Sequence, residues 1–339
     1  GAEKLDTKAD SNEKTVEAEA KHFSPFLLLM APQGVVTLYS GCGGIYNADW
    51  DEEATGKYVS INDIESFPIP SVEDTATTFD GWFCDSSYAE RAGSVPTAGK
   101  TYYARWIRSS STVNGNIMNY SYNKSGINVQ GSGSILTTFM DHGYTAYYKA
   151  NDGNASGAGS NVACAVSGDV FKNVSGNIYI AETASFSGKY VRYTYYIWNR
   201  GESDAAGFNL GAAADVKIGG DDRASLNLRS DSGGSYVSMK NKNKEFRLYY
   251  GGSNVSSVST LWTGYYGKRT NNIFNNNPVS QSGIDSALAF SWKNLSLPAN
   301  SVTVKSVLLG CADSDYFIPE FQLRLDTNDD GLMESHTLK

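Results

Sequence analysis

The 339-residue chain is predicted to be mainly β-structure, with an antiparallel two-sheet sandwich as its largest part. The composition supports this, because 34 glycines and 22 tyrosines accompany only 19% charged residues, as in turn-rich β proteins. From about residue 126, short β-like runs are separated by Gly, Ser, Asn or Asp, with no amphipathic helical pattern between them. Turns spaced roughly every eight to twelve residues favour a sandwich over parallel βαβ units.

The strands of this large region are expected between residues 126 and 312. The run 190–199 is aromatic on both faces, with Tyr196 and Trp198 alternating against Tyr193 and Tyr195. A strand covered on both sides explains that pattern, with an exposed ligand platform as the alternative. The expected strands are 135–140, 145–149, 162–166, 178–182, 190–199, 214–218, 236–240, 246–250, 287–292 and 302–309.

A smaller unit precedes the sandwich. It contains an alternating run at 36–39, the pair Gly43 and Gly44, the phrase Phe-Asp-Gly-Trp-Phe at 79–83 and Tyr-Tyr-Ala-Arg-Trp at 102–106. A unit of about seventy residues buries only about 60% of its unfolded surface, so Trp82 and Trp106 are expected to anchor its core. Gly81 is expected at a turn or a close approach of two strands.

The order of these motifs resembles the internalin B-repeat, also called the Listeria and Bacteroides repeat. The resemblance covers about a fifth of the chain, and it departs from the family at Cys42, where Asn is usual, and at the acidic insertion 49–53. It implies a β-grasp-like module on a bacterial surface or secreted protein, serving as spacer, stalk or contact surface without catalysis.

Five segments follow from these patterns. Residues 1–25 are expected to form a flexible tether, because they are rich in Lys, Glu, Asp and Ala. Residues 26–108 form the repeat module, 109–125 a linker or loop rich in Ser and Asn, and 126–312 the sandwich. Residues 313–339 are expected to be a C-terminal strand or hairpin with an acidic turn.

The charge of the chain argues against a nucleic acid partner. The net charge is −8 with a pI near 5.0, and binding to phosphates needs clustered Lys and Arg. No run of about eighteen apolar residues is present, so we expect no membrane span in this chain. The expected location is extracellular or cell-surface, with anchoring by a segment not present in this chain.

The four cysteines, Cys42, Cys84, Cys164 and Cys311, have no Cys-x-x-Cys spacing, which argues against a zinc site. Cys42 and Cys84 both fall in the first module, and two alternatives stay open for them. They form a disulfide, or they are buried free thiols.

Three phrases of the large region, at 213–222, 261–267 and 285–292, resemble large β-sandwich domains of uncharacterised bacterial surface proteins, with the supersandwich type of galactose mutarotase-like proteins as one form. They carry the candidate ligand-binding residues Trp262, Tyr265, Tyr266, Asp221 and Asp222. Aromatic rings stack on sugars, but Asp beside Gly is also what tight turns require.

A glycan-cleaving enzyme is the remote alternative for this region. It needs two carboxylates about 5 to 10 Å apart across a cleft, and Asp215, Asp221, Asp222 and Asp285 are the candidates. No Gly-x-Ser-x-Gly elbow is present, so the sequence offers no catalytic residues for nucleophilic hydrolysis.

The C-terminal acidic turn is the one metal-like motif. Asp326, Asn328 and Asp330 precede Gly331 at the alternate spacing of a calcium loop, with Glu334 as a further ligand. The twelfth position is Thr337 rather than Glu, so a plain acidic turn is the alternative. Any bound calcium is expected to be structural, and no other cofactor is expected.

The sequence therefore predicts a non-catalytic surface protein for adhesion, display or spacing. Its expected partner is a host or neighbouring-cell surface protein or glycan. The alternative is a carbohydrate-binding or polysaccharide-handling surface protein that uses exposed aromatic side chains.

Overall fold

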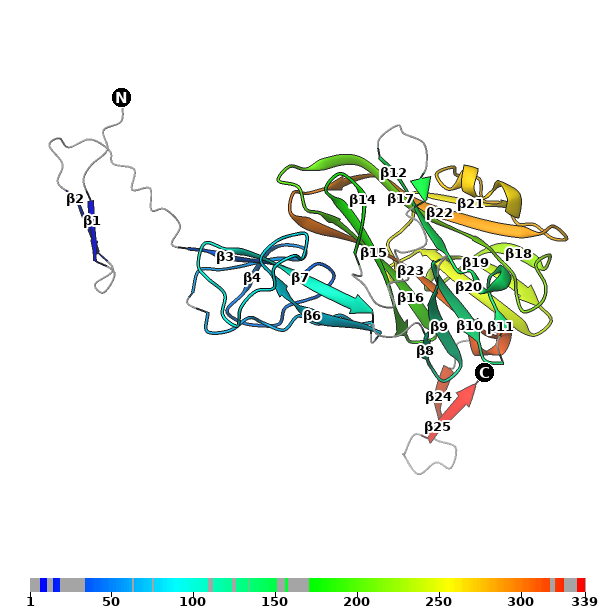
Figure 1. Ribbon diagram of the computed structural model, residues 1–339. Coiled ribbons are helices and arrows are strands. Elements are labelled where there is room, and N and C mark those ends of the chain that lie inside the picture. The colour runs from blue at the N-terminus through cyan, green and yellow to red at the C-terminus, as the bar shows by residue number, and fades with distance from the viewer. Residues whose placement is uncertain are drawn as a thin grey trace. The chain divides into compact units, whose positions relative to one another are not determined.

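The computed structural model describes residues 7–10, 15–18, 34–62, 64–74, 76–108, 112–123, 126–133, 135–150, 156–157, 171–317, 321–325 and 334–338 (Figure 1). The chain divides into two compact units, residues 1–33 and residues 34–339. In the first unit, β1 (Thr7–Asp10) and β2 (Thr15–Ala18) pair antiparallel. The expected tether therefore contains a hairpin.

The second unit begins with a five-stranded sheet, which we call the first sheet. Its strand order is β4 (Asp51–Ala54), β5 (Lys57–Ser60), β3 (Val36–Tyr39), β7 (Thr101–Arg108), β6 (Thr77–Phe83). β3 and β7 run parallel, and the other neighbours are antiparallel. This sheet occupies the region of the expected repeat module.

Two tryptophans anchor the first sheet, as predicted. Trp82 and Trp106 are 4% and 2% exposed. Their indole N–H groups donate to the carbonyls of Pro68 and Ser40, both at 2.9 Å, so neither ring leaves a buried donor unpaired. Gly81 has φ 153° at a bulge of β6, where a Cβ would lie 2.2 Å from Nη1 of Arg91. Only glycine fits there without displacing that guanidinium.

The sandwich has a seven-stranded antiparallel sheet as one layer. Its order is β14 (Lys172–Ser175), β15 (Ile178–Ser187), β16 (Tyr190–Asn199), β23 (Ser301–Asp313), β20 (Lys244–Gly251), β19 (Gly234–Asn241), β18 (Ser225–Asp231).

Two smaller sheets contribute to the same core from the other side. The five-stranded sheet has the order β13 (Ser156–Gly157), β12 (Thr145–Ala150), β17 (Ala205–Asp215), β22 (Ser286–Leu297), β21 (Thr260–Tyr265). The four-stranded sheet has the order β11 (Ile135–Leu136), β10 (Gly126–Gly131), β9 (Met118–Asn123), β8 (Thr112–Asn114). A bridge between Ile127 and Tyr144 joins them.

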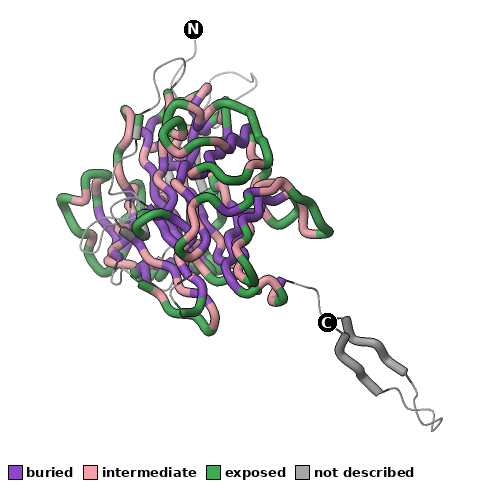
Figure 2. Tube along the Cα trace, turned by 90° about the vertical axis from the view of Figure 1, so that its right-hand side faces the viewer, coloured by how far each residue is buried: buried purple, intermediate pink, exposed green. Residues whose placement is uncertain are grey.

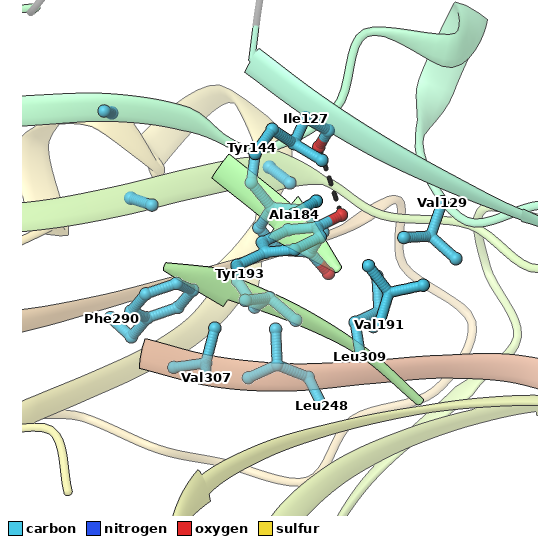
Figure 3. Packing of buried hydrophobic residues seen from close by; sticks show 14 of the residues in the cluster. Ile127, Val129, Tyr144, Ala184, Val191, Tyr193, Leu248, Phe290, Val307 and Leu309 are labelled. Carbon is cyan, nitrogen blue, oxygen red and sulfur yellow. Dashed lines mark hydrogen bonds between the residues drawn. The ribbon is translucent and has the colours of Figure 1, made fainter. Parts of the chain in front are cut away.

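One continuous apolar core lies between these layers, as expected for a sandwich. Tyr144, Tyr193 and Phe290 pack together at its centre, and the Tyr193 hydroxyl donates to the carbonyl of Ile127 at 3.1 Å (Figure 3). Buried residues follow the strands and exposed residues follow the turns (Figure 2). The mainly β, antiparallel fold class is therefore confirmed.

The expected linker over 109–125 is wrong for most of its length. Residues 112–123 form β8 and β9 of the four-stranded sheet, and Met118, Tyr120 and Tyr122 are buried. Alternate large side chains face the core while the intervening Asn and Ser residues face outward, which is the period of a half-buried strand.

Short 3-10 helices complete the described fold: η1 (Phe139–Asp141), η2 (Tyr266–Lys268), η3 (Thr270–Asn272) and η4 (Ser314–Phe317). Near the C-terminus, β24 (Phe321–Leu325) pairs with β25 (Glu334–Leu338). No helix among the described residues has the length and apolar character needed to cross a membrane. The expected strand at 162–166 lies outside the described residues.

The first sheet and the seven-stranded sheet share a second core, which we call the joint. β16 passes through it, so that Trp198 is fully buried against Tyr39, Tyr103 and Phe171. Tyr193 and Tyr195 lie on its other face, in the sandwich core. The prediction that this strand is covered on both sides is therefore confirmed.

Candidate binding site at one end of the five-stranded sheet

Three neighbouring strands bring acidic and aromatic groups to one end of the five-stranded sheet. β17 ends at Asp215, which pairs with Ala287 of β22. Asp285 directly precedes β22, and Tyr265, the last residue of β21, pairs with Ser286. We call this group, with Tyr266 and Arg269, the Asp215 corner.

Each of the two carboxyl groups of the corner has one oxygen without a hydrogen-bond partner in the part of the chain that the structure describes. Oδ1 of Asp215 and Oδ1 of Asp285 are buried and have no partner among the described residues. Burial raises the pKa of Asp215 to about 6, and the negative charge of Asp285 adds to this. The pKa of Asp285 is also raised, first by burial and then by the charge of Asp222. The residues as wholes are partly exposed, so a ligand that enters the corner could supply the missing hydrogen-bond donors to these two buried oxygens.

Two tyrosines stand beside these acids. Tyr265 is 48% exposed, and its ring meets Tyr266 edge to face with centroids 4.8 Å apart. The guanidinium of Arg269 lies 5.9 Å from the Tyr266 ring and donates from Nη1 to the Tyr266 carbonyl at 2.9 Å. Tyr265 is the ring of the pair that offers an exposed face.

Asp221 and Asp222 lie in the turn that follows β17. The Asp221 carboxylate accepts a hydrogen bond from the Arg223 backbone N–H at 2.9 Å, the Asx arrangement of a tight turn. The Asp222 carbonyl accepts from the Ser286 N–H at 3.0 Å, which ties the turn to β22. Asp222 also pairs with Arg223 at 4.0 Å on the surface. Asp221 thus serves the turn, and Asp222 borders the corner.

Trp262 is not part of an exposed aromatic row. It is 5% exposed and packs with Ala213, Ile273 and Ala289 on the outer face of the five-stranded sheet. A Cβ on Gly264 would lie 2.3 Å from the indole, so the ring covers that glycine closely. The expectation that Trp262 stacks on a surface sugar is therefore wrong, because small neighbours let the ring lie flat against the sheet.

The expected calcium residues Asp326, Asn328 and Asp330 lie outside the described residues, and Glu334 is the first residue of β25. Within the described ranges, no group of three or more His, Cys, Asp or Glu is arranged to hold a metal. Cys42 and Cys84 are both free, so they form no disulfide; the alternative of buried free thiols holds for Cys42 and is wrong for Cys84, which is exposed. Cys164 lies outside the described residues.

Sequence reasoning missed the charged groups of the joint. Arg108, Asp74 and Glu182 are each 1% exposed. Nη2 of Arg108 donates to the Glu182 carbonyl at 2.6 Å, and its Nη1 lies 3.9 Å from Oδ2 of Asp74. The signal available in the sequence was Glu182 itself, a carboxylate that directly follows the apolar run 178–181.

The joint also reaches the surface. An open depression of about 490 Å³ runs along β23 and is lined by Thr55, Pro298, Ser301, Val302, Thr303 and Val304. Thr55 belongs to the turn between β4 and β5, and its carbonyl accepts from the Val302 N–H at 2.7 Å. This depression marks the line where the first sheet meets the sandwich.

Comparison with known proteins gives no family for the chain. No protein-family model matches it, and neither does any curated protein.

Proposed function

We propose that the protein is a non-catalytic contact protein of the bacterial surface or extracellular space, in which the first sheet and the sandwich act as one rigid unit. The observation that carries this proposal is the joint. A stalk or display protein must hold its contact surfaces at fixed positions, and a shared apolar core does so where a linker does not.

Two arginines stabilise the joint, one from the first sheet and one from the sandwich. Arg108, at the end of β7, reaches the edge of β15, and its guanidinium lies 3.4 Å from the centroid of the Tyr122 ring. Arg200 follows β16, and its guanidinium lies 4.8 Å from the ring of Tyr88, in the connection between β6 and β7 of the first sheet. The first sheet therefore contributes Arg108, which packs against a ring of the sandwich, and the sandwich contributes Arg200, which packs against a ring of the first-sheet region.

The Arg200 guanidinium depends on these rings. It lies 4.2 Å from the Tyr179 ring and 4.3 Å from the Trp198 ring. Its Nε and Nη2 are buried and have no hydrogen-bond partner among the described residues. The rings are thus its main favourable environment, and separation of the two parts would remove two of the four rings around it, Tyr88 and Tyr103.

The partner we propose is a protein or glycan on a host or neighbouring cell. The test is binding of fluorescently labelled full-length protein to intact bacterial and mammalian cells, before and after protease or periodate treatment of the cells. Saturable binding that one treatment abolishes is expected, and protease or periodate sensitivity identifies the partner as protein or glycan. Absence of saturable binding to all cell types tested would overturn the contact role.

A second candidate function is glycan binding at the Asp215 corner. Sugars are recognised by aromatic faces and by carboxylates that accept hydrogen bonds from hydroxyl groups. Tyr265 supplies the exposed ring, and the unpaired oxygens of Asp215 and Asp285 supply acceptors.

This candidate is tested on a glycan array with the wild type, Tyr265→Ala and Asp215→Asn. The matched control is Tyr46→Ala, since Tyr46 lies far from the corner in sequence, between β3 and β4, and is 90% exposed. Binding lost in both corner variants and kept in the control supports the site. Equal binding by all four proteins, or none by the wild type, contradicts it.

A further inference from the structure

Next to the joint, on the face of β15 that is turned to the sandwich core, lies a carboxyl group that Arg108 does not neutralise. Glu182 lies on the inner face of β15, directly opposite Tyr195 of β16. The residue is 1% exposed, and its Oε1 has no hydrogen-bond partner among the described residues. Nε and Nη1 of Arg108 also lack such partners, and the Tyr195 hydroxyl is the polar group next to the Glu182 carboxyl.

Of the two buried carboxyl groups, Asp74 and Glu182, Asp74 has more hydrogen-bond donors around it. Its Oδ1 accepts from the Ala76 N–H at 2.9 Å, and its Oδ2 accepts from the Thr77 hydroxyl at 2.7 Å. The Tyr122 hydroxyl donates to the same Oδ2. Three donors thus surround the Asp74 carboxyl group, and the Arg108 guanidinium lies beside it. The single positive charge of Arg108 is therefore balanced by Asp74.

A second buried anion would have no counterion of its own. The Arg108 contact with Glu182 that has hydrogen-bond geometry goes to the backbone carbonyl, not to the carboxyl group. The groups facing the Glu182 side chain are Arg108 of β7 and Tyr195 of β16, with Tyr193 and Tyr144 behind Tyr195. A carboxyl group in such surroundings is favoured in its neutral form, because an unpaired buried charge costs several kcal/mol.

We propose that Glu182 controls the stability of the joint through its protonation. As a neutral acid it stabilises the contact between β15 and the first sheet, and its ionisation weakens that contact. Beside Glu182, side chains rather than a neighbouring strand form hydrogen bonds with the backbone of β15. Arg108 covers the Glu182 carbonyl, and the Tyr122 hydroxyl accepts from the Ala184 N–H at 3.0 Å. An ionised Glu182 draws Arg108 away from Asp74 or draws water into this edge.

The direction of the pH dependence follows from burial. Burial raises the pKa of Glu182 from 4.5 to about 8, against the opposing effects of Arg108 and Tyr195. The folded state then holds a proton that the unfolded state loses. The stability due to this proton is fully present below pH 4.5 and is lost as the pH rises through 8. One linked proton raises the unfolding equilibrium constant by up to about tenfold per pH unit in that window.

The experiment compares denaturant unfolding of the full-length wild type and Glu182→Gln between pH 5 and pH 9. Gln mimics the neutral acid, so the wild type should lose stability with rising pH by a slope that the variant lacks. Glu245→Gln is the matched control, since Glu245 is a 7% exposed glutamate on β20 that pairs with Arg247 at 2.7 Å. Equal pH slopes in the wild type and Glu182→Gln would overturn the proposal.

Two further measurements cover other outcomes. Hydrogen exchange at the Ala184 amide, corrected for the intrinsic pH dependence, should accelerate above pH 8 in the wild type and not in Glu182→Gln; unchanged protection would refute the loosening. If Glu182→Gln fails to fold, the proposal is tested by an NMR pH titration of the wild type labelled with ¹³C at the glutamate carboxyl groups. One resonance titrating near pH 8 is expected, and titration of every glutamate near its ordinary pH would overturn the proposal.

Discussion

The joint and the Asp215 corner both gather carboxyl groups beside tyrosines and an arginine, yet they differ in exposure and in charge balance. In the joint, Asp74 and Glu182 are both 1% exposed, and Arg108 supplies a buried cation. At the corner, Asp215 and Asp285 are partly exposed, and Tyr265 presents an open ring.

The difference separates a structural group of charges from a candidate binding site. Buried charges that neutralise one another fix the position of the chain segments that carry them. Partly exposed acids with unpaired oxygens leave hydrogen-bonding capacity for a ligand. Substitutions in the joint should therefore change stability most, and substitutions at the corner should change binding.

The largest effect is expected for Arg108→Met. Removal of the buried cation leaves Asp74 without its counterion, and such losses cost about 3–5 kcal/mol of unfolding free energy. Arg105→Met in the same strand is the control, because its pair with Asp80 at 3.5 Å is partly exposed to solvent and should contribute less than about 1 kcal/mol. Denaturant unfolding measures both, and equal losses would show that the joint is no stronger than a surface pair.

A loss of about 3 kcal/mol is expected for Trp262→Ala. The ring is buried among Ala213, Ile273 and Ala289, so its removal leaves a cavity between these residues. The melting temperature should fall. An unchanged melting temperature would indicate that the Trp262 ring is exposed and would make it a candidate for glycan binding again.

A smaller effect, of opposite sign, is expected for Asp215→Asn. The pKa of Asp215 is raised from 3.8 to about 6, so the wild type loses stability as the pH rises through that range. The Asn variant lacks this loss and should be more stable at pH 7 by about 1 kcal/mol or less, because solvent screens the partly exposed carboxyl. Melting temperatures at pH 4 and pH 7 test the difference, and an identical pH dependence in both proteins would contradict it.

The smallest change in stability is expected for Tyr265→Ala. The ring is 48% exposed, so its loss should cost less than about 0.5 kcal/mol. Circular dichroism melting checks this value. A large destabilisation would place Tyr265 with the core residues and remove it as a reporter of glycan binding.

Much of the fold was predictable because strand period and turn residues are local signals. Trp82 and Trp106 were correctly expected to be core residues, and the two-faced pattern of 190–199 correctly indicated a strand covered on both sides. β17 was recognised only at its end, because its first part is mostly Ala and Gly, with Phe208 and Leu210 as its only large apolar residues.

The joint was not predictable, because its charged groups come from distant parts of the chain. Asp74 precedes β6, Arg108 ends β7, and Glu182 lies in β15. A single sequence gives the residue types but not the long-range pairing that brings them together. The corner was partly predictable, since Asp222, Tyr265 and Tyr266 were named, but the burial of Trp262 depends on the small residues of neighbouring strands.

Calorimetric unfolding of the full-length protein tests most directly whether the first sheet and the sandwich form one unit. A shared core and two packed arginines predict a single cooperative transition for residues 34–339, with equal calorimetric and van't Hoff enthalpies. Arg108→Met should broaden this transition or split it. Two resolved transitions in the wild type would contradict the account, because the first sheet would then melt independently of the sandwich.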